Sequence, residues 1–391
     1  MKVACYCQHV LGIGHFHRSL ELCKALAENH ETVMILGGPD VTLPETKVRF
    51  LQLPGLKMDE NFSRLIPCRE PEKGNLEAVK DGRRQQLYDF FSSFEPDIFL
   101  VELYPFGRKA FRFELDPILK GIDSGELAPC IRLCSLRDIL VEKKDKQKYE
   151  TRVLTVLNTL FDGLLIHSDP DFIPLEKTFS QTGSIAIPYR YTGFITPPPG
   201  STGKGTAIRR KLGLSEHDKL LIASIGGGNV GSELLRATAE AAVILKDETN
   251  IHFHLFTGKY SDVKLLEELR QTPGNQLVVH NFCSDFTDWL EAADLSISMA
   301  GYNTCMNLLA AGTPALLYPF AQNREQRMRI SAFSTTSPFG LLEKEDLDPI
   351  RFAERITAHL QLDRQPGKAD LNGAATSSEL CCTAEIWNRQ S

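Results

Sequence analysis

Residues 295–320 decide the fold class, and they read LSISMAGYNTCMNLLAAGTPALLYPF. Their pattern predicts a strand over Leu295–Met299 and a helix over Thr304–Ala311, which ends at Gly312 with a proline two residues later. A second strand is then expected over Ala315–Tyr318. Two short strands joined by one helix indicate parallel pairing inside an α/β sheet.

The same alternation of strand and helix patterns continues on both sides of a proline-rich segment. The first expected strand is Lys2–Cys7 and the first expected helix is Ser19–Glu28. Residues 196–205, TPPPGSTGKG, suit neither a helix nor a central strand, because prolines remove hydrogen-bond donors. The sequence therefore predicts an α/β protein with two Rossmann-like, doubly wound parallel-sheet domains that face each other across a cleft. The expected parts are an N-terminal domain over 1–196, a linker over 197–207, a C-terminal domain over 208–362 and a tail with a helix over 363–391.

The composition of the 391 residues is that of a globular protein. Hydrophobic residues make up 42% and charged residues 24%, which excludes a disordered, collagen-like or coiled-coil chain. The net charge is -6 and no long basic tract occurs, so we expect no nucleic-acid partner. No apolar run reaches the roughly 18 residues of a membrane span, and no signal-peptide pattern precedes the first strand. The ten scattered cysteines are expected to be reduced thiols, and the expected location is the cytoplasm.

Candidate catalytic residues follow the first strand. Gly12 and Gly14 let the chain turn closely past a ligand, and His15 lies where open α/β sheets bind ligands. An imidazole titrates near neutrality, so His15 is a candidate general base, although a histidine there can also merely cap the turn. Glu102 and Asp138, each at a strand end, are candidate partners of the histidine. Either carboxylate can equally belong to a structural ion pair with Arg108 or Arg137.

A glycine-rich loop, GGGNVGS at residues 226–232, follows the first strand of the second half. Gly227, Gly228 and Asn229 are candidate ligand contacts, because backbone amides without side chains can approach phosphate or sugar oxygens. The alternative is a tight strand-to-helix turn. We favour the ligand contact, since three consecutive glycines cost more chain entropy than a turn needs.

The densest group of candidate binding residues lies in the stretch that decides the fold. Gly301 permits close approach of a ligand, and Asn303 or Thr304 can cap the helix, leaving amides for a diphosphate. Glu325 and Gln326 place a carboxylate beside an amide, which suits paired hydrogen bonds to sugar hydroxyls. The alternative is a polar first turn of a surface helix. Three glycine-rich strand ends together with this pair favour a binding site.

The order of these motifs resembles the two-domain GT-B glycosyltransferases. It is closest to family 28, the branch that contains the N-acetylglucosaminyltransferase MurG of peptidoglycan synthesis, and within it to a group of predicted bacterial glycosyltransferases without assigned substrates. The resemblance rests on GIGHFHR at 12–18, GYNT at 301–304, AAGTPA at 310–315, PF at 319–320 and EQ at 325–326. Shorter segments that resemble the same group are ELYPFGR at 102–108, CSLRD at 134–138, HSDP at 167–170 and YTG at 191–193.

The resemblance implies a nucleotide-sugar donor bound by the C-terminal domain and an acceptor hydroxyl bound by the N-terminal domain. Transfer would be inverting, with no metal and no cofactor, and the favoured donor is a UDP-sugar such as a UDP-N-acetylhexosamine. His15 matches the histidine near the reacting centre. The family's ribose-binding glutamate is replaced by Asn307, a neutral amide. The implied donor-binding residues are Gly14, Gly227, Gly228, Asn229, Phe282, Cys283, Gly301, Tyr302, Asn303, Thr304, Asn307, Glu325 and Gln326.

Two alternative functions remain open at this stage. A nucleotide-sugar hydrolase or epimerase could use the same scaffold, because His15 would activate water as readily as an acceptor hydroxyl. A catalytically inactive nucleotide-sugar sensor is suggested by Asn307. The acceptor is unknown, with lipid-linked and small-molecule acceptors both compatible with the resemblance. Peripheral contact with the inner face of the membrane would need an apolar patch, for which residues 87–94 are a candidate, although a core-facing helix is the simpler interpretation.

Overall fold

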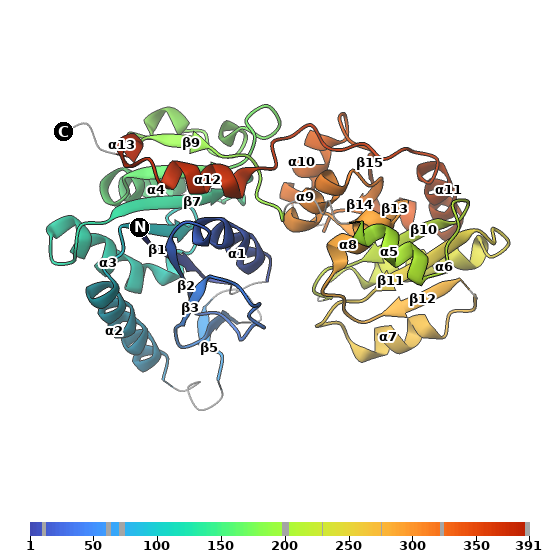
Figure 1. Cartoon of the computed structure of the whole chain (residues 1–391), viewed down its shortest axis with the longest axis horizontal. Helices are drawn as coiled ribbons and strands as arrows, with labels where there is room; N and C mark the ends of the chain where they lie inside the picture. The colour runs from blue at the N-terminus through green and yellow to red at the C-terminus, as the bar shows by residue number, and fades with distance from the viewer. Residues whose placement is uncertain are drawn as a thin grey trace. The chain divides into compact units, whose positions relative to one another are not determined.

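The computed structural model of the protein describes residues 1–9, 13–59, 64–69, 75–197, 203–228, 230–274, 276–320 and 324–387. The chain divides into two compact units (Figure 1). The N-terminal unit consists of Met1–Thr196 together with Asp370–Ser391, and the C-terminal unit of Pro197–Ala369. Each unit is built on one parallel sheet, so the predicted fold class of two Rossmann-like α/β domains is confirmed.

The sheet of the N-terminal unit has buried, mostly apolar inner strands, whereas its two edge strands are partly exposed. Its strands run in the spatial order β3-β2-β1-β6-β7-β8-β9, and all neighbouring pairs are parallel. The order reverses between β1 and β6, where a ligand-binding crevice forms in sheets of this kind. The strands are β1 (Lys2–Cys7), β2 (Glu31–Leu36), β3 (Arg49–Gln52), β6 (Ile98–Glu102), β7 (Ile131–Arg137), β8 (Gly163–His167) and β9 (Tyr189–Tyr191).

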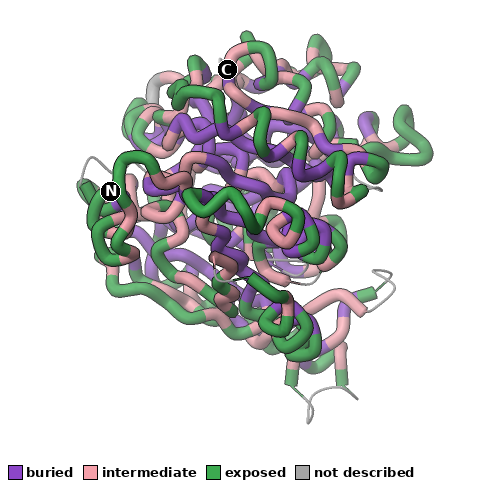
Figure 2. The backbone as a smooth tube through the Cα atoms, turned by 90° about the vertical axis from the view of Figure 1, so that its right-hand side faces the viewer, coloured by how far each residue is buried: buried purple, intermediate pink, exposed green. Residues whose placement is uncertain are grey.

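Helices cover both faces of this sheet. One core joins Ala4 and Tyr6 to α2, α3 and α4, and the other joins Val3 and Cys5 to α1, α12 and α13. In Figure 2 the buried segments of the chain gather inside and the exposed segments lie outside. The helices are α1 (Gly14–Ala27), α2 (Leu76–Phe94), α3 (Arg112–Ser124), α4 (Lys146–Leu160), α12 (Gly373–Cys381) and α13 (Ala384–Trp387), and an antiparallel pair is formed by β4 (Leu56–Met58) and β5 (Leu65–Pro67).

The last helices of the chain belong to the N-terminal unit. Helix α12 packs on α1, and the backbone amide of Phe194 donates to the carbonyl of Asp370 at 2.7 Å. The Trp387 indole is 1% exposed and lies against Gly163, where an added Cβ would come within 2.1 Å of the ring. The C-terminal segment is therefore part of the core of this unit.

The C-terminal unit repeats the design with the spatial order β12-β11-β10-β13-β14-β15, again all parallel. Its order reverses between β10 and β13. The strands are β10 (Lys219–Ser224), β11 (Ile251–Phe256), β12 (Leu277–His280), β13 (Leu295–Met299), β14 (Ala315–Tyr318) and β15 (Phe339–Leu341). The helices are α5 (Lys204–Lys211), α6 (Ser232–Ile244), α7 (Val263–Arg270), α8 (Phe286–Ala292), α9 (Tyr302–Ala311), α10 (Arg324–Phe333) and α11 (Pro349–His359).

Helix α5 begins inside the segment predicted to be a linker. It packs on α8, and an added Cβ at Gly205 would come within 2.9 Å of the backbone at Glu291. The proline-rich pattern ends before Lys204, so the linker predicted over 197–207 is too long by the first turn of this helix. A helix over 204–211 was not apparent from the sequence, because KGTAIRRK has few apolar residues.

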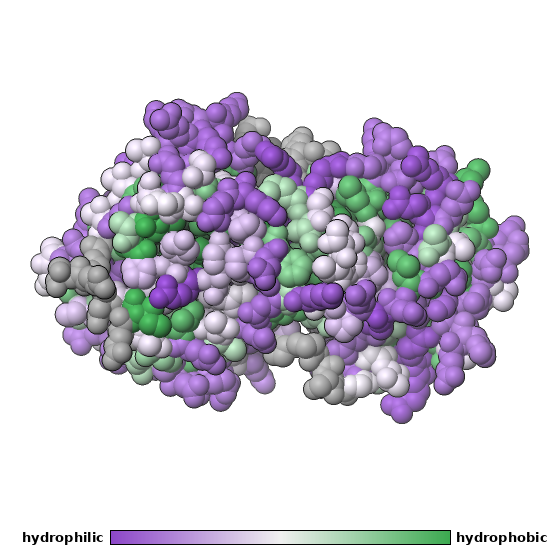
Figure 3. Space-filling model, turned by 90° about the horizontal axis from the view of Figure 1, so that it is seen from above, coloured by the Kyte–Doolittle hydropathy of each residue, from purple (hydrophilic) through white to green (hydrophobic). Residues whose placement is uncertain are grey.

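The candidate membrane patch at residues 87–94 faces the core. Leu87, Phe91 and Phe94 are buried on α2 and pack under the sheet, so the core-facing interpretation is correct for this helix. The face of the molecule in Figure 3 is mostly hydrophilic, with hydrophobic side chains in separate patches. No helix among the described residues is long and apolar enough to cross a membrane.

Candidate active site

The candidate catalytic residues of the N-terminal unit meet where its sheet reverses direction. His15 lies in the first turn of α1, directly after β1, and Glu102 ends the neighbouring strand β6. Gly14 is the first residue of that helix, and Gly12 lies outside the described residues. The helix was expected from Ser19, so the histidine is on a rigid element instead of the predicted loop.

His15 and Glu102 form a hydrogen-bonded pair. The His15 Nδ1 lies 2.7 Å from Glu102 Oε1, and a carboxylate can only accept, so Nδ1 carries the proton and donates it. Burial lowers the pKa of His15 to about 4, although the Glu102 carboxylate acts to raise it. The imidazole is therefore neutral at pH 7, with the lone pair on Nε2. The His15 side chain keeps 19% of its surface exposed, while Glu102 is buried.

Two arginines complete this cluster around the carboxylate. Arg18 donates to Glu102 Oε1, the oxygen that also accepts from His15, and Arg108 Nε lies 3.6 Å from Glu102 Oε2. Burial acts to raise the pKa of Glu102, but the His15, Arg108 and Arg18 groups outweigh burial and hold that pKa well below its usual value. The carboxylate is thus fixed in its ionised form. The sequence placed Arg18 three residues after His15, the spacing of one helix face, but its role was not predicted.

Asp138 and His167 lie at the ends of the next two strands. Asp138 is fully buried just after β7, and its catalytic role stays a prediction. His167, which the sequence did not single out as a site residue, ends β8 between the hydroxyls of Ser135 at 2.6 Å and Thr192 at 2.9 Å. Burial and Arg18 lower the pKa of His167 to about 3, so this imidazole is neutral and structural.

In the glycine-rich loop of the C-terminal unit, the backbone packing requires a glycine at one position, Gly228. Gly228 has φ +93, and an added Cβ would come within 2.6 Å of the Thr257 carbonyl oxygen and the Ser261 amide. The loops after β10 and β11 therefore interlock by close backbone approach. Gly227 has more space, since only Tyr260 lies within reach, at 3.6 Å. Asn229 lies outside the described residues.

Gly301 precedes α9 on the other side of the reversal point of this sheet. Among the described residues, an added Cβ at Gly301 would meet only Thr304 Oγ1, at 3.8 Å, so no described group fills the space in front of this residue. Gly301 is the N-cap of the helix and, as a glycine, has no side chain that could cap it. The guanidinium of Arg329 lies 5.6 Å from the centre of the Tyr302 ring, a cation–π contact that stabilises the first turn of α9. The N-terminus of a helix of this length favours an anion.

The remaining predicted donor-binding residues divide between two helices and one strand end. Asn303, Thr304 and Asn307 lie half-buried on α9, and Glu325 and Gln326 lie in the first turn of α10. The Gln326 Oε1 accepts a hydrogen bond from the Phe320 amide at 2.7 Å, so this carboxamide oxygen already supports the backbone after β14.

Phe282 is an exposed aromatic side chain just past β12. Its side chain is 61% exposed, whereas the neighbouring rings of Phe256 and His280 stack on each other and Trp289 packs against both at an angle. Burial and the Asp285 carboxylate raise the pKa of the Cys283 thiol to about 12, so this thiol stays protonated. Among the residues described, no group of three or more His, Cys, Asp or Glu side chains is placed to hold a metal ion.

The chain is similar in sequence and fold to glycosyltransferases. Residues 222–371 match the glycosyltransferase family 28 C-terminal domain. The chain is 30% identical over 131 residues to the UDP-N-acetylglucosamine--N-acetylmuramyl-(pentapeptide) pyrophosphoryl-undecaprenol N-acetylglucosamine transferase of Opitutus terrae, an alignment that covers 32% of this chain and 34% of that protein. The chain spans about a third to a half of the length of the curated relatives it matches.

Solved structures share the whole architecture at low sequence identity. A UDP-glucosyltransferase from Polygonum tinctorium superimposes with a TM-score of 0.61 at 13% identity, over 100% of this chain and 99% of that chain. MurG from Acinetobacter baumannii superimposes with a TM-score of 0.54 at 13% identity, over 97% of this chain and 94% of that chain. The protein therefore has the GT-B glycosyltransferase fold. Its residues 222–371 match the model of the glycosyltransferase family 28 C-terminal domain, the branch that the motifs of that half resemble.

Proposed function

We propose that the protein is a glycosyltransferase that moves a sugar from a nucleotide-sugar donor to an acceptor hydroxyl. The observation that carries the proposal is the pair of His15 and Glu102, a neutral histidine oriented by a buried carboxylate at the reversal point of the N-terminal sheet. The favoured donor is a UDP-N-acetylhexosamine, supported by the name of the relative from Opitutus terrae. Transfer proceeds with inversion and without a metal.

The N-terminal unit binds the acceptor in this proposal, and His15 is the general base. The Nε2 lone pair takes the proton of the acceptor hydroxyl as its oxygen attacks the sugar carbon that bears the diphosphate. Glu102 accepts the hydrogen bond from the His15 Nδ1–H, so the imidazole keeps the tautomer with a free Nε2 lone pair. The carboxylate also stabilises the positive charge of the imidazolium that forms when His15 takes the proton. The bond from the sugar carbon to the diphosphate oxygen breaks, and the diphosphate leaves with the electron pair.

The C-terminal unit binds the donor. The N-terminus of α9 stabilises the charge that develops on the leaving diphosphate, and the open space at Gly301 supports this assignment. Phe282 offers an exposed ring for the base. Asn307, Glu325 and the amide nitrogen of Gln326 are the proposed contacts of the donor's two sugars.

Thermal unfolding with UDP, GDP, ADP, CDP and dTDP tests the donor site. A nucleotide at about 100 times its dissociation constant adds about 2.7 kcal/mol of stability, and we expect UDP to give the largest shift. Phe282→Ala should remove that shift without changing the unfolding temperature of the free protein, because the ring is 61% exposed. Ile350→Ala is the matched control, since Ile350 is 66% exposed on α11 of the same unit. A protein that no nucleotide stabilises has no donor site.

Product analysis separates transfer from hydrolysis. Wild-type protein with UDP-N-acetylglucosamine should release UDP only when a suitable hydroxyl acceptor is present, and the sugar should appear on that acceptor. Free sugar formed without any acceptor would identify a hydrolase, in which His15 activates water. Donor binding without turnover over a wide acceptor panel would identify a sensor.

A further inference from the structure

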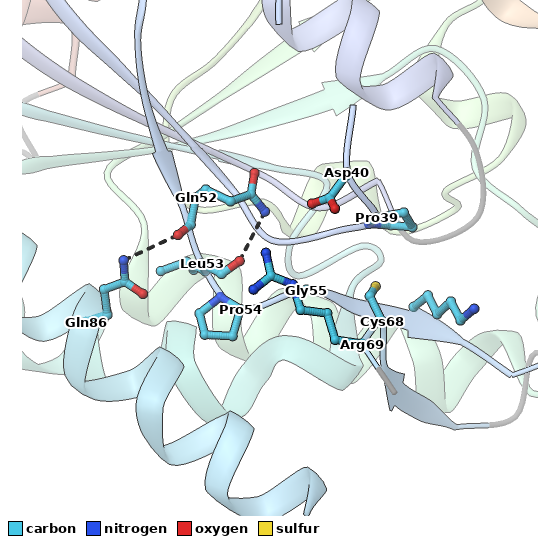
Figure 4. Close-up of a pocket in the computed structure, with 10 residues that line it drawn as sticks. Pro39, Asp40, Gln52, Leu53, Pro54, Gly55, Cys68, Arg69 and Gln86 are labelled. Atoms are coloured by element: carbon cyan, nitrogen blue, oxygen red, sulfur yellow. Dashed lines mark hydrogen bonds between the residues drawn. The ribbon is translucent and has the colours of Figure 1, made fainter. Parts of the chain in front are cut away.

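A polar pocket opens at the carboxyl ends of β2 and β3 in the N-terminal unit (Figure 4). Its volume is about 380 Å³, which is within the range of small-molecule sites. In a parallel sheet the carboxyl ends share one edge, so the pocket lies on the edge that carries His15 and Glu102. Neighbouring strands are about 4.8 Å apart, which places the pocket roughly 10–15 Å from the end of β6.

Hydrogen bonds from buried side chains to backbone carbonyls hold the walls of the pocket in place. The buried guanidinium of Arg83 donates through Nη1 to the carbonyl of Gly37 at 2.9 Å and to the carbonyl of Pro54 at 2.6 Å. The His9 Nε2 lies 2.7 Å from the Pro39 carbonyl, which ties the wall to the end of β1. The pocket is therefore preformed, and a ligand would not need to order these loops on binding.

Charged side chains of both signs line the pocket without ion pairs. Arg69 and Lys57 come from the segment of β4 and β5, and Asp40 follows β2. The structure records no ion pair for any of the three within the described residues. In Figure 4 the guanidinium of Arg69 extends toward Asp40 and Gln52. The two opposite charges therefore face a common space.

Two carboxamides supply hydrogen-bond acceptors to the same space. Gln52 donates through Nε2 to the Leu53 carbonyl at 3.1 Å, and Gln86 donates through Nε2 to the Gln52 carbonyl at 3.3 Å. These contacts fix which end of each carboxamide is the nitrogen. No described residue donates to either carboxamide oxygen, so both oxygens can accept hydrogen bonds from hydroxyl groups.

We propose that this pocket binds a small hydroxylated anion, such as a sugar phosphate or a sugar acid. Arg69 and Lys57 bind the phosphate or carboxylate, and Asp40 with the oxygens of Gln52 and Gln86 accepts from the hydroxyls. This inference rests on the proposed function, in which the ligand is the anionic part of the acceptor that lies away from the reacting hydroxyl. It therefore assigns the acceptor to the class of hydroxylated anions.

Isothermal titration of the full chain tests the chemistry with separate probes. Glucose 6-phosphate and gluconate carry hydroxyls and an anion, inorganic phosphate carries only the anion, and glucose carries only hydroxyls. We expect the first two to bind, Arg69→Gln to weaken them at least tenfold, and Asp40→Asn at least threefold. Arg64→Gln is the matched control, because Arg64 adjoins β5, is 80% exposed and pairs with Asp59 outside the pocket. Vesicles of phosphatidylglycerol against phosphatidylcholine distinguish a headgroup from a soluble ligand.

Several results would overturn the inference. Equal binding of phosphate and glucose 6-phosphate would mean an anion alone is recognised, and equal binding of glucose would exclude a role for the charge. Binding that Arg69→Gln leaves unchanged would lie elsewhere, and no binding of any probe or vesicle would remove the site. The nucleotide-induced stabilisation is measured on the same samples. If the probes bind the pocket but no nucleotide stabilises the protein, the proposed function is contradicted. If a nucleotide stabilises the protein but no probe binds the pocket, only this inference is contradicted.

Discussion

Glu102 Oε1 accepts hydrogen bonds from both His15 and Arg18, while Oε2 of the same carboxylate faces Arg108 at 3.6 Å. One buried carboxylate thus fixes the tautomer of a partly exposed histidine and is itself kept ionised by two guanidinium groups. This arrangement separates the group that exchanges protons from the group that orients it. It also makes the contribution of Glu102 measurable apart from donor binding.

Glu102→Gln should lower kcat for sugar transfer roughly 10²–10⁴-fold, because a neutral amide no longer selects the Nδ1 tautomer or stabilises the imidazolium that forms. His15→Ala should cost at least as much. Rates are measured as UDP release in the presence of acceptor. The internal control is the stabilisation by UDP, which should stay unchanged because this nucleotide is assigned to the other unit. An active Glu102→Gln variant would remove the pair from the mechanism.

Two glycines of the C-terminal unit should respond in opposite ways to alanine. At Gly301 an added methyl group has no neighbour nearer than 3.8 Å, so Gly301→Ala should keep the unfolding temperature and lose the stabilisation by UDP. At Gly228 the methyl group would meet backbone at 2.6 Å with φ +93, so Gly228→Ala should cost about 2 kcal/mol or more. Both variants are compared by thermal unfolding with and without UDP. A full UDP response in Gly301→Ala would contradict the assignment of α9.

Arg83 should be essential for the stability of the N-terminal unit. It is completely buried, makes a bidentate pair with Glu114 at 2.6 and 2.7 Å, and bridges two backbone carbonyls. Arg83→Met leaves the carboxylate buried without its cation, which should cost roughly 3–5 kcal/mol. Urea unfolding followed by Trp387 fluorescence in a Trp289→Phe background isolates this unit. Adding Glu114→Gln should recover part of the loss, and no recovery would assign the cost to the carbonyl contacts.

The stability of the N-terminal unit should fall as the pH drops from about 6.5 toward 4. Burial lowers the pKa of His167 to about 3 and that of His15 to about 4, below the unfolded value of about 6.5. The unfolded state therefore binds these protons first, and the stabilisation present above pH 6.5 is lost on acidification. Urea unfolding at pH 7.5, 5.5 and 4.5 measures the slope. His167→Gln should flatten it by up to about 1.4 kcal/mol per pH unit, and an equal slope would show that His167 titrates normally.

The strands of both sheets were largely predictable. Lys2–Cys7, Leu295–Met299 and Ala315–Tyr318 have the predicted bounds, because strands buried on both faces leave continuous apolar runs. The start of α1 was not predictable, since Gly14 indicated a turn, whereas it is the first residue of the helix in the structure. The helix begins at Gly14 instead of Ser19, and this earlier start puts His15 and Arg18 on one face.

An ion pair of Glu102 with Arg108 was among the alternatives that the sequence left open, and the structure contains it, but the path of the chain that forms it could not be read from the sequence. Leu103 has φ 66 and Arg108 has φ 54, so the chain after β6 turns twice through a left-handed conformation without a glycine at either point. This path returns the guanidinium to the strand end that it has just left. Likewise, the pocket at Arg69 joins segments from β2, β3, β5 and α2, and only the folded chain brings them together.

The placement of Trp387 in the core of the N-terminal unit has a consequence for biosynthesis. The ribosome completes the seven-stranded sheet of that unit long before it adds α12 and α13. The entire C-terminal unit is synthesised in between. Until then Gly163 and the outer face of α1 lack the side chains that cover them. The unit made first is therefore finished last, and a chain that stops early would leave an apolar surface for chaperones to recognise.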